Sequence, residues 1–99
     1  MFVHNVYFWV KPDLTPPQME TLMKGMKALT TIPSVKFGFV GKPASTDRPV
    51  IDRSYSYALV VAFDDKAGHD LYQEHPIHDA FRKDCGTFWN RVLIYDAVD

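Results

Sequence analysis

Three residues that exchange protons or hydrogen bonds near neutral pH lie within one stretch of seven residues. Tyr72, His75 and His78 occur in the segment YQEHPIH, with Pro76 between the two histidines. An imidazole accepts a proton near pH 7, and a phenol hydroxyl donates a hydrogen bond to a carbonyl or enolate oxygen. With His78 as base and Tyr72 as donor, the pair would suit proton abstraction beside a carbonyl, a reaction that needs no cofactor.

The same pair has two interpretations that involve no chemistry. A hydrogen bond between His78 and Tyr72 would give both polar groups a partner at the start of a helix. A cavity that binds a small molecule would use the two side chains for recognition alone. The residues by themselves leave catalysis, binding and structural packing as three alternatives.

The other histidines and the single cysteine have structural interpretations. His75 precedes a proline, so it is extended, and its ring can cap the adjoining helix end. We predict a structural role for His75 and Pro76, and we expect His69 to be exposed to solvent. Cys85 has the spacing of a small buried residue and not the surroundings of a nucleophile.

A metal site has little support in the sequence. His75 and His78 form a His-x-x-His pair that provides two ligands, whereas zinc sites take three or four ligands from the protein. The chain contains one cysteine and no His-Glu-x-x-His motif, and its five glycines match no nucleotide-binding fingerprint. We therefore predict no metal and no cofactor.

The residues around these side chains predict an α+β fold. Runs rich in β-branched and aromatic residues predict strands, and apolar residues spaced at i, i+3, i+4 and i+7 predict helices. The predicted elements are a strand at 2–10, a helix at 15–29, strands at 34–41 and 55–63, helical pieces from Asp64 or Asp65 to about Tyr72 and from Pro76 to about Phe88, and a strand at 91–98. This β-α-β-β-α-β order is typical of a ferredoxin-like unit, a four-stranded antiparallel sheet with its helices on one face.

Two segments carry more specific local signals. Thr15, Pro16 and Gln18 predict a helix N-terminus with a capping box. Gly25, in the middle of that helix, weakens it by about 1 kcal/mol relative to alanine. Residues 42–54 contain two prolines and several charges, and they predict a loop long enough to close over a pocket or to join a dimer contact.

Length and composition indicate one domain that spans residues 1–99. Hydrophobic residues make up 46% and charged residues 23% of the chain, as is typical of a globular protein. The net charge of −1 comes with no basic block, so we predict no nucleic-acid partner. No apolar run approaches the length of a membrane-spanning helix, which is about 20 residues. No signal peptide is recognisable. The single cysteine fits a reducing compartment, and we expect a cytoplasmic protein.

Both faces of the predicted sheet are apolar. Along residues 2–10, His4 and Phe8 point to one face, and Tyr7 and Trp9 point to the other. Two helices cover one face of a four-stranded sheet, and exposing the second face would cost several kcal/mol at about 25 cal/mol per Å². We therefore predict a homodimer in which two sheets pack through their second faces.

Four segments together resemble a known family. They are VHNVYFWVKPDLTPPQ at 3–18, YSYALVVAFDD at 55–65, YQEHPIHDAF at 72–81 and VLIYD at 92–96. Over nearly its whole length the chain resembles the stress-responsive A/B barrel domain (Dabb) family, most of whose members have no assigned activity. The resemblance implies a dimeric α+β barrel of two ferredoxin-like units, with a small cavity between sheet and helices in each subunit.

The resemblance also implies a site. One enzymatic relative, a plant polyketide cyclase, performs a cofactor-free aldol closure with a Tyr and a His at the positions of Tyr72 and His78. Pocket residues of that enzyme match His4 and Tyr57. Tyr57 stands where family members commonly carry a histidine, which argues against the same substrate. The implied function is cyclase- or lyase-like chemistry on a small aromatic or carbonyl compound. The alternative is a dimer that binds a small molecule, or responds to stress, without chemistry.

The predicted site therefore combines an acid/base pair with an apolar lining. His78 and Tyr72 are the predicted catalytic residues. The first helix contributes methionines, whose flexible side chains adapt to a ligand. The predicted ligand-binding residues are His4, Phe8, Met23, Met26, Tyr57 and Leu59.

Overall fold

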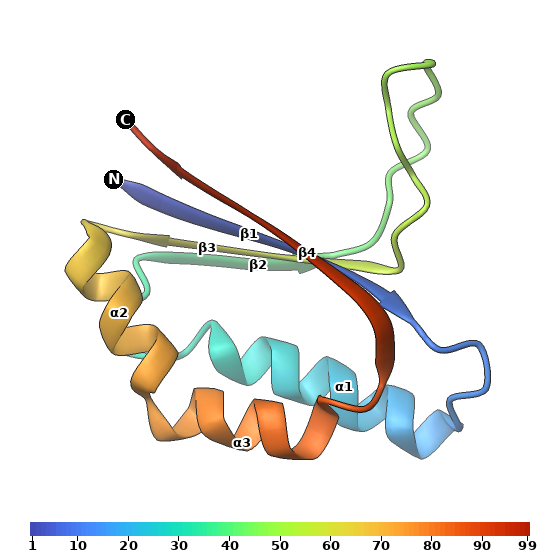
Figure 1. Cartoon of the computed structure of the whole chain (residues 1–99), viewed down its shortest axis with the longest axis horizontal. Helices are drawn as coiled ribbons and strands as arrows, with labels where there is room; N and C mark the ends of the chain where they lie inside the picture. The colour runs from blue at the N-terminus through green and yellow to red at the C-terminus, as the bar shows by residue number, and fades with distance from the viewer.

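The computed structural model describes the chain from Met1 to Asp99, and its elements follow the expected order (Figure 1). They are β1 (Phe2–Val10), α1 (Pro16–Leu29), β2 (Phe37–Gly41), β3 (Tyr57–Phe63), α2 (Lys66–Glu74), α3 (Pro76–Cys85) and β4 (Trp89–Val98). The β-α-β-β-α-β order is confirmed, with the second helical region divided in two at His75.

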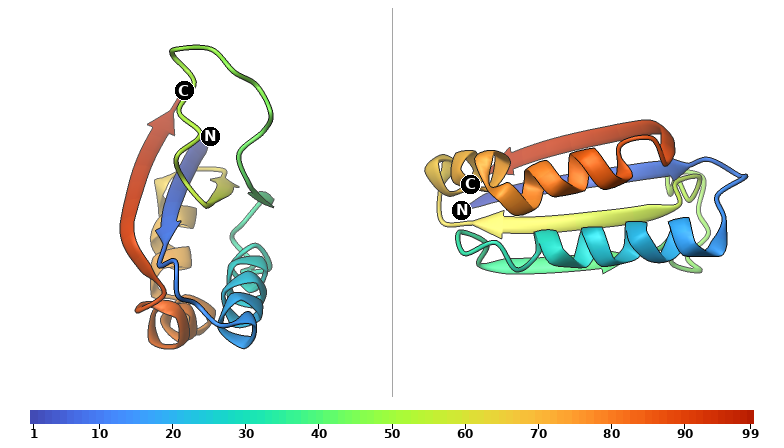
Figure 2. Two further views of the ribbon diagram at one scale, coloured as in Figure 1. Left: turned by 90° about the vertical axis from the view of Figure 1, so that its right-hand side faces the viewer. Right: turned by 90° about the horizontal axis from the view of Figure 1, so that it is seen from below.

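The four strands form one antiparallel sheet in the order β2-β3-β1-β4. All three helices lie on one face of this sheet, which we call the inner face; the opposite face is the outer face (Figures 1 and 2). The arrangement is ferredoxin-like, as predicted. Because β1 is central, Val6 has Leu59 of β3 directly opposite on one side and Ile94 of β4 on the other.

Helix starts follow the local signals in the sequence. The Gln18 N–H donates to the Thr15 hydroxyl and the Gln18 side chain accepts from the Thr15 N–H, so the capping box of α1 is confirmed. The Asp65 carboxylate accepts from the Gly68 N–H and caps α2. His75 is extended, with φ −68° and ψ 143°, as the residue before a proline prefers.

Several predicted boundaries shift by a few residues, and the last strand begins at Trp89 instead of residue 91. The second strand begins at Phe37 because the Val35 N–H donates to Ile32 in a turn that follows α1. The third strand begins at Tyr57. Helix α3 ends at Cys85 because the Phe88 N–H donates to the Cys85 carbonyl and closes the helix with a turn.

The helices divide the inner face between them. Helix α1 lies under β3 and β2, and α3 lies under β1 and β4 (Figure 2). The buried side chains between the layers include Phe8, Leu22, Met26, Leu59 and Tyr72. Strand β4, at the edge, is covered less well than β1, since Val92 and Ile94 on its inner face are 41% and 48% exposed. The inner layer is therefore open along the β4 edge.

The outer face is apolar and has no helix over it. Phe37 and Phe39 of β2 are 59% and 53% exposed, and Tyr95 of β4 is 61% exposed. The segment between β2 and β3 extends away from the sheet on this same side (Figures 1 and 2). Its base is fixed by a hydrogen bond of 3.1 Å from Trp9 Nε1 to the Ser54 hydroxyl.

None of the helices combines the length and the hydropathy that a bilayer span requires.

Gly25 has a packing role that its helix propensity does not reveal. A methyl group at this position would lie 2.9 Å from Phe81 Cδ1 and 3.1 Å from Cys85 Sγ. These atoms belong to α3, so the missing side chain lets α1 and α3 approach closely.

We expect Gly25→Ala to lower the free energy of unfolding by about 1 kcal/mol. Overpacking costs about 1–3 kcal/mol, and the better helix propensity of alanine returns about 1 kcal/mol. Urea denaturation measures the difference. The control is Lys24→Ala, on the exposed side of the same helix, which should change stability by less than about 0.5 kcal/mol. A more stable Gly25→Ala protein would contradict the packing role.

Candidate functional site

The break at His75 and Pro76 brings Tyr72 and His78 together. Tyr72 lies near the end of α2, and His78 lies in the first turn of α3. Their rings pack edge to face, with centroids 4.8 Å apart and planes at 86°. The Tyr72 ring also meets the His4 ring of β1 at 5.9 Å. Residues from two helices and one strand thus meet at one point on the inner face.

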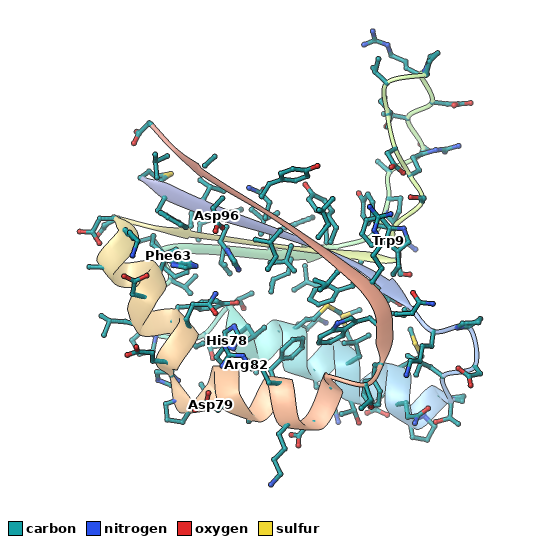
Figure 3. The ribbon with its side chains drawn as sticks, viewed as in Figure 1. Trp9, Phe63, His78, Asp79, Arg82 and Asp96 are labelled. Carbon is teal, nitrogen blue, oxygen red and sulfur yellow. The ribbon has the colours of Figure 1, made fainter.

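A cavity of about 190 Å³ opens at this point, under β1 and β4. Its lining is mostly apolar, with Phe8, Leu59 and Trp89 among the walls. The polar side chains on its surface are His4, Tyr72, Gln73, His78 and Arg82. Figure 3 shows His78 and Arg82 in the layer between α3 and the sheet. The cavity is therefore an apolar chamber with its polar groups on one side.

The structure brings together five of the predicted site residues and leaves three apart. His4, Phe8, Leu59, Tyr72 and His78 line the cavity. The three predicted residues outside it are Met23, Met26 and Tyr57, which pack with the hydrophobic core. The methionines lie on α1, whose one residue in the cavity lining is Leu29, at the end of the helix.

Sequence reasoning missed the contribution of β4 and of the rim. Val92 and Ile94 line the cavity, together with Gln73 and Arg82. The alternation of Val92 and Ile94 was visible in the sequence, and a strand order that places β4 beside β1 would have put them opposite Phe8 and Val6. Nothing in the sequence marks Gln73 or Arg82.

The imidazole of His78 has a polar atom without a partner. Its Nδ1 is buried and makes no hydrogen bond within the protein. The hydrogen bond to Tyr72 that a purely structural role would use is absent, since the two rings meet edge to face. Buried polar atoms are almost always satisfied, and exceptions occur at binding and catalytic sites. A side chain that lines the cavity thus carries a buried polar atom without a partner.

Burial and a neighbouring positive charge set the protonation of His78. Loss of solvent, followed by the charge of Arg82, lowers the pKa of His78 from 6.5 to about 4. The imidazole is therefore neutral at pH 7 and free to accept a hydrogen bond or a proton. Burial raises the pKa of Tyr72 above its usual range, so the phenol keeps its proton and acts as a donor.

Arg82 is held at the rim by its neighbours. Its guanidinium donates to the Gln73 carbonyl at 3.2 Å, to the Gln73 side chain at 3.0 Å and to the Asp79 carboxylate at 3.0 Å. The two bonds to Gln73 connect α2 and α3 across the break, and the bond to Asp79 lies within α3. They hold a positive charge beside the cavity, where it favours a ligand oxygen that carries negative charge.

His4 pairs with Asp96 of the edge strand. The two residues are directly opposite in the β1–β4 register, and His4 Nδ1 lies 2.5 Å from the Asp96 carboxylate. Burial lowers the pKa of His4, and the hydrogen bond to Asp96 opposes that shift.

The expectation of an exposed His69 is wrong. Helix α2 folds back over β1, and the His69 ring stacks on the Phe2 ring with their centroids 4.5 Å apart.

His75 and Cys85 are engaged in structure. The Ile77 N–H donates to His75 Nδ1 at 3.1 Å, so the ring of His75 caps α3, which begins with Pro76. Cys85 is buried, and burial raises the pKa of its thiol to about 11, so no thiolate forms at neutral pH.

The family model of the stress-responsive A/B barrel domain matches residues 2–99. The chain belongs to this family. Among curated proteins, this A/B barrel domain is similar to olivetolic acid cyclase from Cannabis sativa, with 26% identity over 94 residues that make up 94% of this chain and 91% of the cyclase.

Two solved structures illustrate the range of relatives that share the fold. A dimeric ferredoxin-like protein of unknown function from Thermobifida fusca is 24% identical, with a TM-score of 0.77 over 97% of this chain and 88% of its own. A hydroxynitrile lyase from Passiflora edulis is 18% identical, with a TM-score of 0.78 over 97% of this chain and 90% of its own. At these identities the likeness establishes the fold alone.

We expect the low pKa of His78 to make folding stability depend on pH. The unfolded chain binds this proton below about pH 6.5 and the folded chain only near pH 4. The unfolded state therefore holds more protons between these values, and stability is lost as the pH falls from 6.5 towards 4. Urea unfolding at pH 7, 6 and 5 measures the slope.

His78→Gln is the matched control, because it removes the titrating group and leaves the carboxylates in place. The variant should show a shallower loss of stability than the natural protein. Proton NMR of the His78 ring across a pH titration should give a titration midpoint below that of a free histidine side chain. A midpoint near 6.5 would contradict the buried environment described for this ring.

Proposed function

We propose that the cavity binds a small aromatic or carbonyl compound, and that His78 and Tyr72 perform cofactor-independent acid/base chemistry on it. The observation that carries this proposal is the buried Nδ1 of His78, which faces no protein partner beside an apolar cavity. The reaction class is cyclase- or lyase-like. Among proteins similar to this chain, one is named as a cyclase and another as a hydroxynitrile lyase.

The volume of the cavity limits the size of the ligand. An apolar cavity of about 150 Å³ admits benzene, and this one measures about 190 Å³. One aromatic ring with a short substituent, or a short carbonyl chain, fits that space. A longer chain would extend through the opening along β4, past Val92 and Ile94.

The chemistry follows from the two protonation states. The neutral His78 removes a proton from the carbon beside a carbonyl, and the C–H electrons move to form an enolate. The Tyr72 hydroxyl donates a hydrogen bond to the enolate oxygen, and Arg82 adds positive charge at the rim. The imidazolium and the enolate form together in an apolar site, so each stabilises the other. The enolate carbon then attacks a second carbonyl, whose oxygen takes the proton back from His78; in a lyase-like reaction the enolate instead re-forms a double bond as the bond to a leaving group breaks, and the leaving group takes that proton.

Binding without chemistry is the second candidate, and one observation favours it. An imidazole with a pKa of about 4 accepts a hydrogen bond readily but is a weak base. A ligand hydroxyl that donates to Nδ1 would satisfy the orphaned nitrogen with no proton transfer. The protein would then be a small-molecule receptor, consistent with a stress-response role.

We expect His78→Ala to reduce turnover by about 10²–10⁴-fold, the usual contribution of a positioned base. Tyr72→Phe should reduce kcat with little change in ligand affinity, because the phenyl ring preserves the packing and loses only the donor. Candidates are first found by thermal shift with aryl ketones and hydroxyaryl carbonyl compounds, and product is then followed by mass spectrometry.

The control is His75→Asn, which keeps a side chain that caps α3 and should leave turnover unchanged. Full turnover by His78→Ala would exclude its role as base. Compounds that stabilise the natural protein but never give product, and that lose affinity in His78→Ala, would support the receptor.

We also propose that two copies form a homodimer through their outer sheet faces. Exposed aromatic side chains on this face, Phe37, Phe39 and Tyr95 among them, lose contact with water in such a dimer. Packed sheets lie about 10 Å apart, and the segment between β2 and β3 stands on this face (Figure 1). It must therefore run beside the sheet of the second copy. A similar solved structure is described as dimeric.

We expect Phe39→Glu or Tyr95→Glu to convert the dimer to a monomer, because each places an unpaired charge within the contact. Light scattering after size exclusion measures the mass. Leu71→Glu is the control; Leu71 is 65% exposed on α2, on the opposite side of the sheet, and should leave the mass unchanged. A monomeric natural protein at micromolar concentration would refute this contact.

A further inference from the structure

A second cluster of side chains lies between α2 and the paired strands β1 and β4. One ring nitrogen of His4, one of His69 and one carboxylate oxygen of Asp96 all lie within 4.8 Å of one another. Figure 3 shows the Asp96 side chain on β4, on the face of the sheet that the helices cover. We propose that these three side chains bind one divalent transition-metal ion. The proposal is independent of the catalytic or receptor role of His78.

The fold fixes two of the three ligands before any ion arrives. His4 and Asp96 are directly opposite in the antiparallel β1–β4 pair, so both point to the inner face. They are already in contact, with His4 Nδ1 2.5 Å from the carboxylate. Two ligands on one zinc ion stand roughly 3.3 Å apart, given metal–ligand bonds of about 2.0–2.2 Å. The Asp96 side chain is 40% exposed, and its freedom allows that small separation.

The third ligand, His69, is held in a fixed plane. Its ring stacks on Phe2 at 4.5 Å with an angle of 28°, and its centroid lies 4.9 Å from that of His4. Only 15% of the His69 side chain is exposed. A buried imidazole whose plane is already set loses little freedom when it binds an ion.

The hydrogen bonds of His69 identify which nitrogen is available. Its Nδ1 lies 3.1 Å from the Asp70 carboxylate, which accepts the proton on that nitrogen. The lone pair is then on Nε2, which faces only the Gln73 side-chain nitrogen at 3.3 Å. A carboxylate that holds the far nitrogen of a ligating imidazole is the usual support of protein metal sites. An ion would replace the weak contact with Gln73.

The chemistry of the three donors indicates the class of ion. Two imidazoles and one carboxylate suit zinc, cobalt, nickel or ferrous iron, and they suit magnesium or calcium poorly. Three protein ligands leave at least one position for water. The ion would tie α2 to the paired strands β1 and β4, in addition to the ring contacts of His69 with β1, and would stabilise the folded state by binding it alone.

The test is titration of the intact protein with Co²⁺, followed by its visible absorption, and with Zn²⁺, followed by Tm. We expect a saturable cobalt band with one ion per chain, and a rise of several degrees in Tm with zinc. His69→Phe preserves the stack on Phe2 and should abolish both effects, as should Asp96→Asn. Asp70→Asn should weaken cobalt binding by about 10–100-fold.

Two controls separate this site from other histidines. His75→Asn and His78→Gln should bind cobalt as the natural protein does. The proposal is overturned if no saturable band forms, if His69→Phe binds cobalt with unchanged affinity, or if either control loses the band. Ligand binding in the cavity is measured with a chelator present, so the failure of the metal site and the failure of the proposed function are distinguishable. Urea unfolding of each variant confirms that it is folded.

Discussion

The peptide unit between His75 and Pro76 determines where polar chemistry lies in this protein. Proline excludes its predecessor from helical conformation and provides no N–H for the helix before it. Helix α2 therefore ends, and α3 starts in a new direction with the His75 ring on its first free N–H. A continuous helix would carry Tyr72 and His78 on different faces, six residues apart. The break instead turns the two rings edge to face beside the sheet.

The cavity exists because the inner layer is filled unevenly. Helix α1 packs tightly on β2 and β3, with Leu22 and Met26 fully buried. Helices α2 and α3 meet at an angle under β1 and β4, and the space at their junction is not filled. Space left unfilled between side chains forfeits dispersion contacts, and the His78 Nδ1 beside it has no partner. A fold that keeps this space unfilled gives up stability there.

The two faces of the sheet show the same conflict between burial and solvation. On the inner face, burial keeps His78 and His4 largely neutral, and the charged groups Arg82 and Asp96 stand at the edges where water reaches them. On the outer face, aromatic side chains have no helix to cover them. The aromatic outer face is what a second copy would cover, and the polar inner edge is what small ligands and ions would reach.

The sequence by itself determined the elements, their order and the starts of the helices, because these depend on periodicity, capping and the backbone limits of proline. It also placed Tyr72 and His78 beside each other, and His4, Phe8 and Leu59 on the inner face, since alternation along a strand is local. Met23 and Met26 lie outside the cavity lining, to which their helix contributes Leu29, and this depends on how α1 sits against the sheet. Strand periodicity cannot reveal that.

Only the tertiary structure decided which distant residues meet. The pairing of His4 with Asp96 requires the register of two strands at opposite ends of the chain. The approach of His69 to both requires the angle at which α2 folds back over β1. The unsatisfied nitrogen of His78 results from the shapes of all its neighbours together. Each of these is a non-local packing outcome, set by the sum of many weak contacts, and no short segment of the chain encodes it.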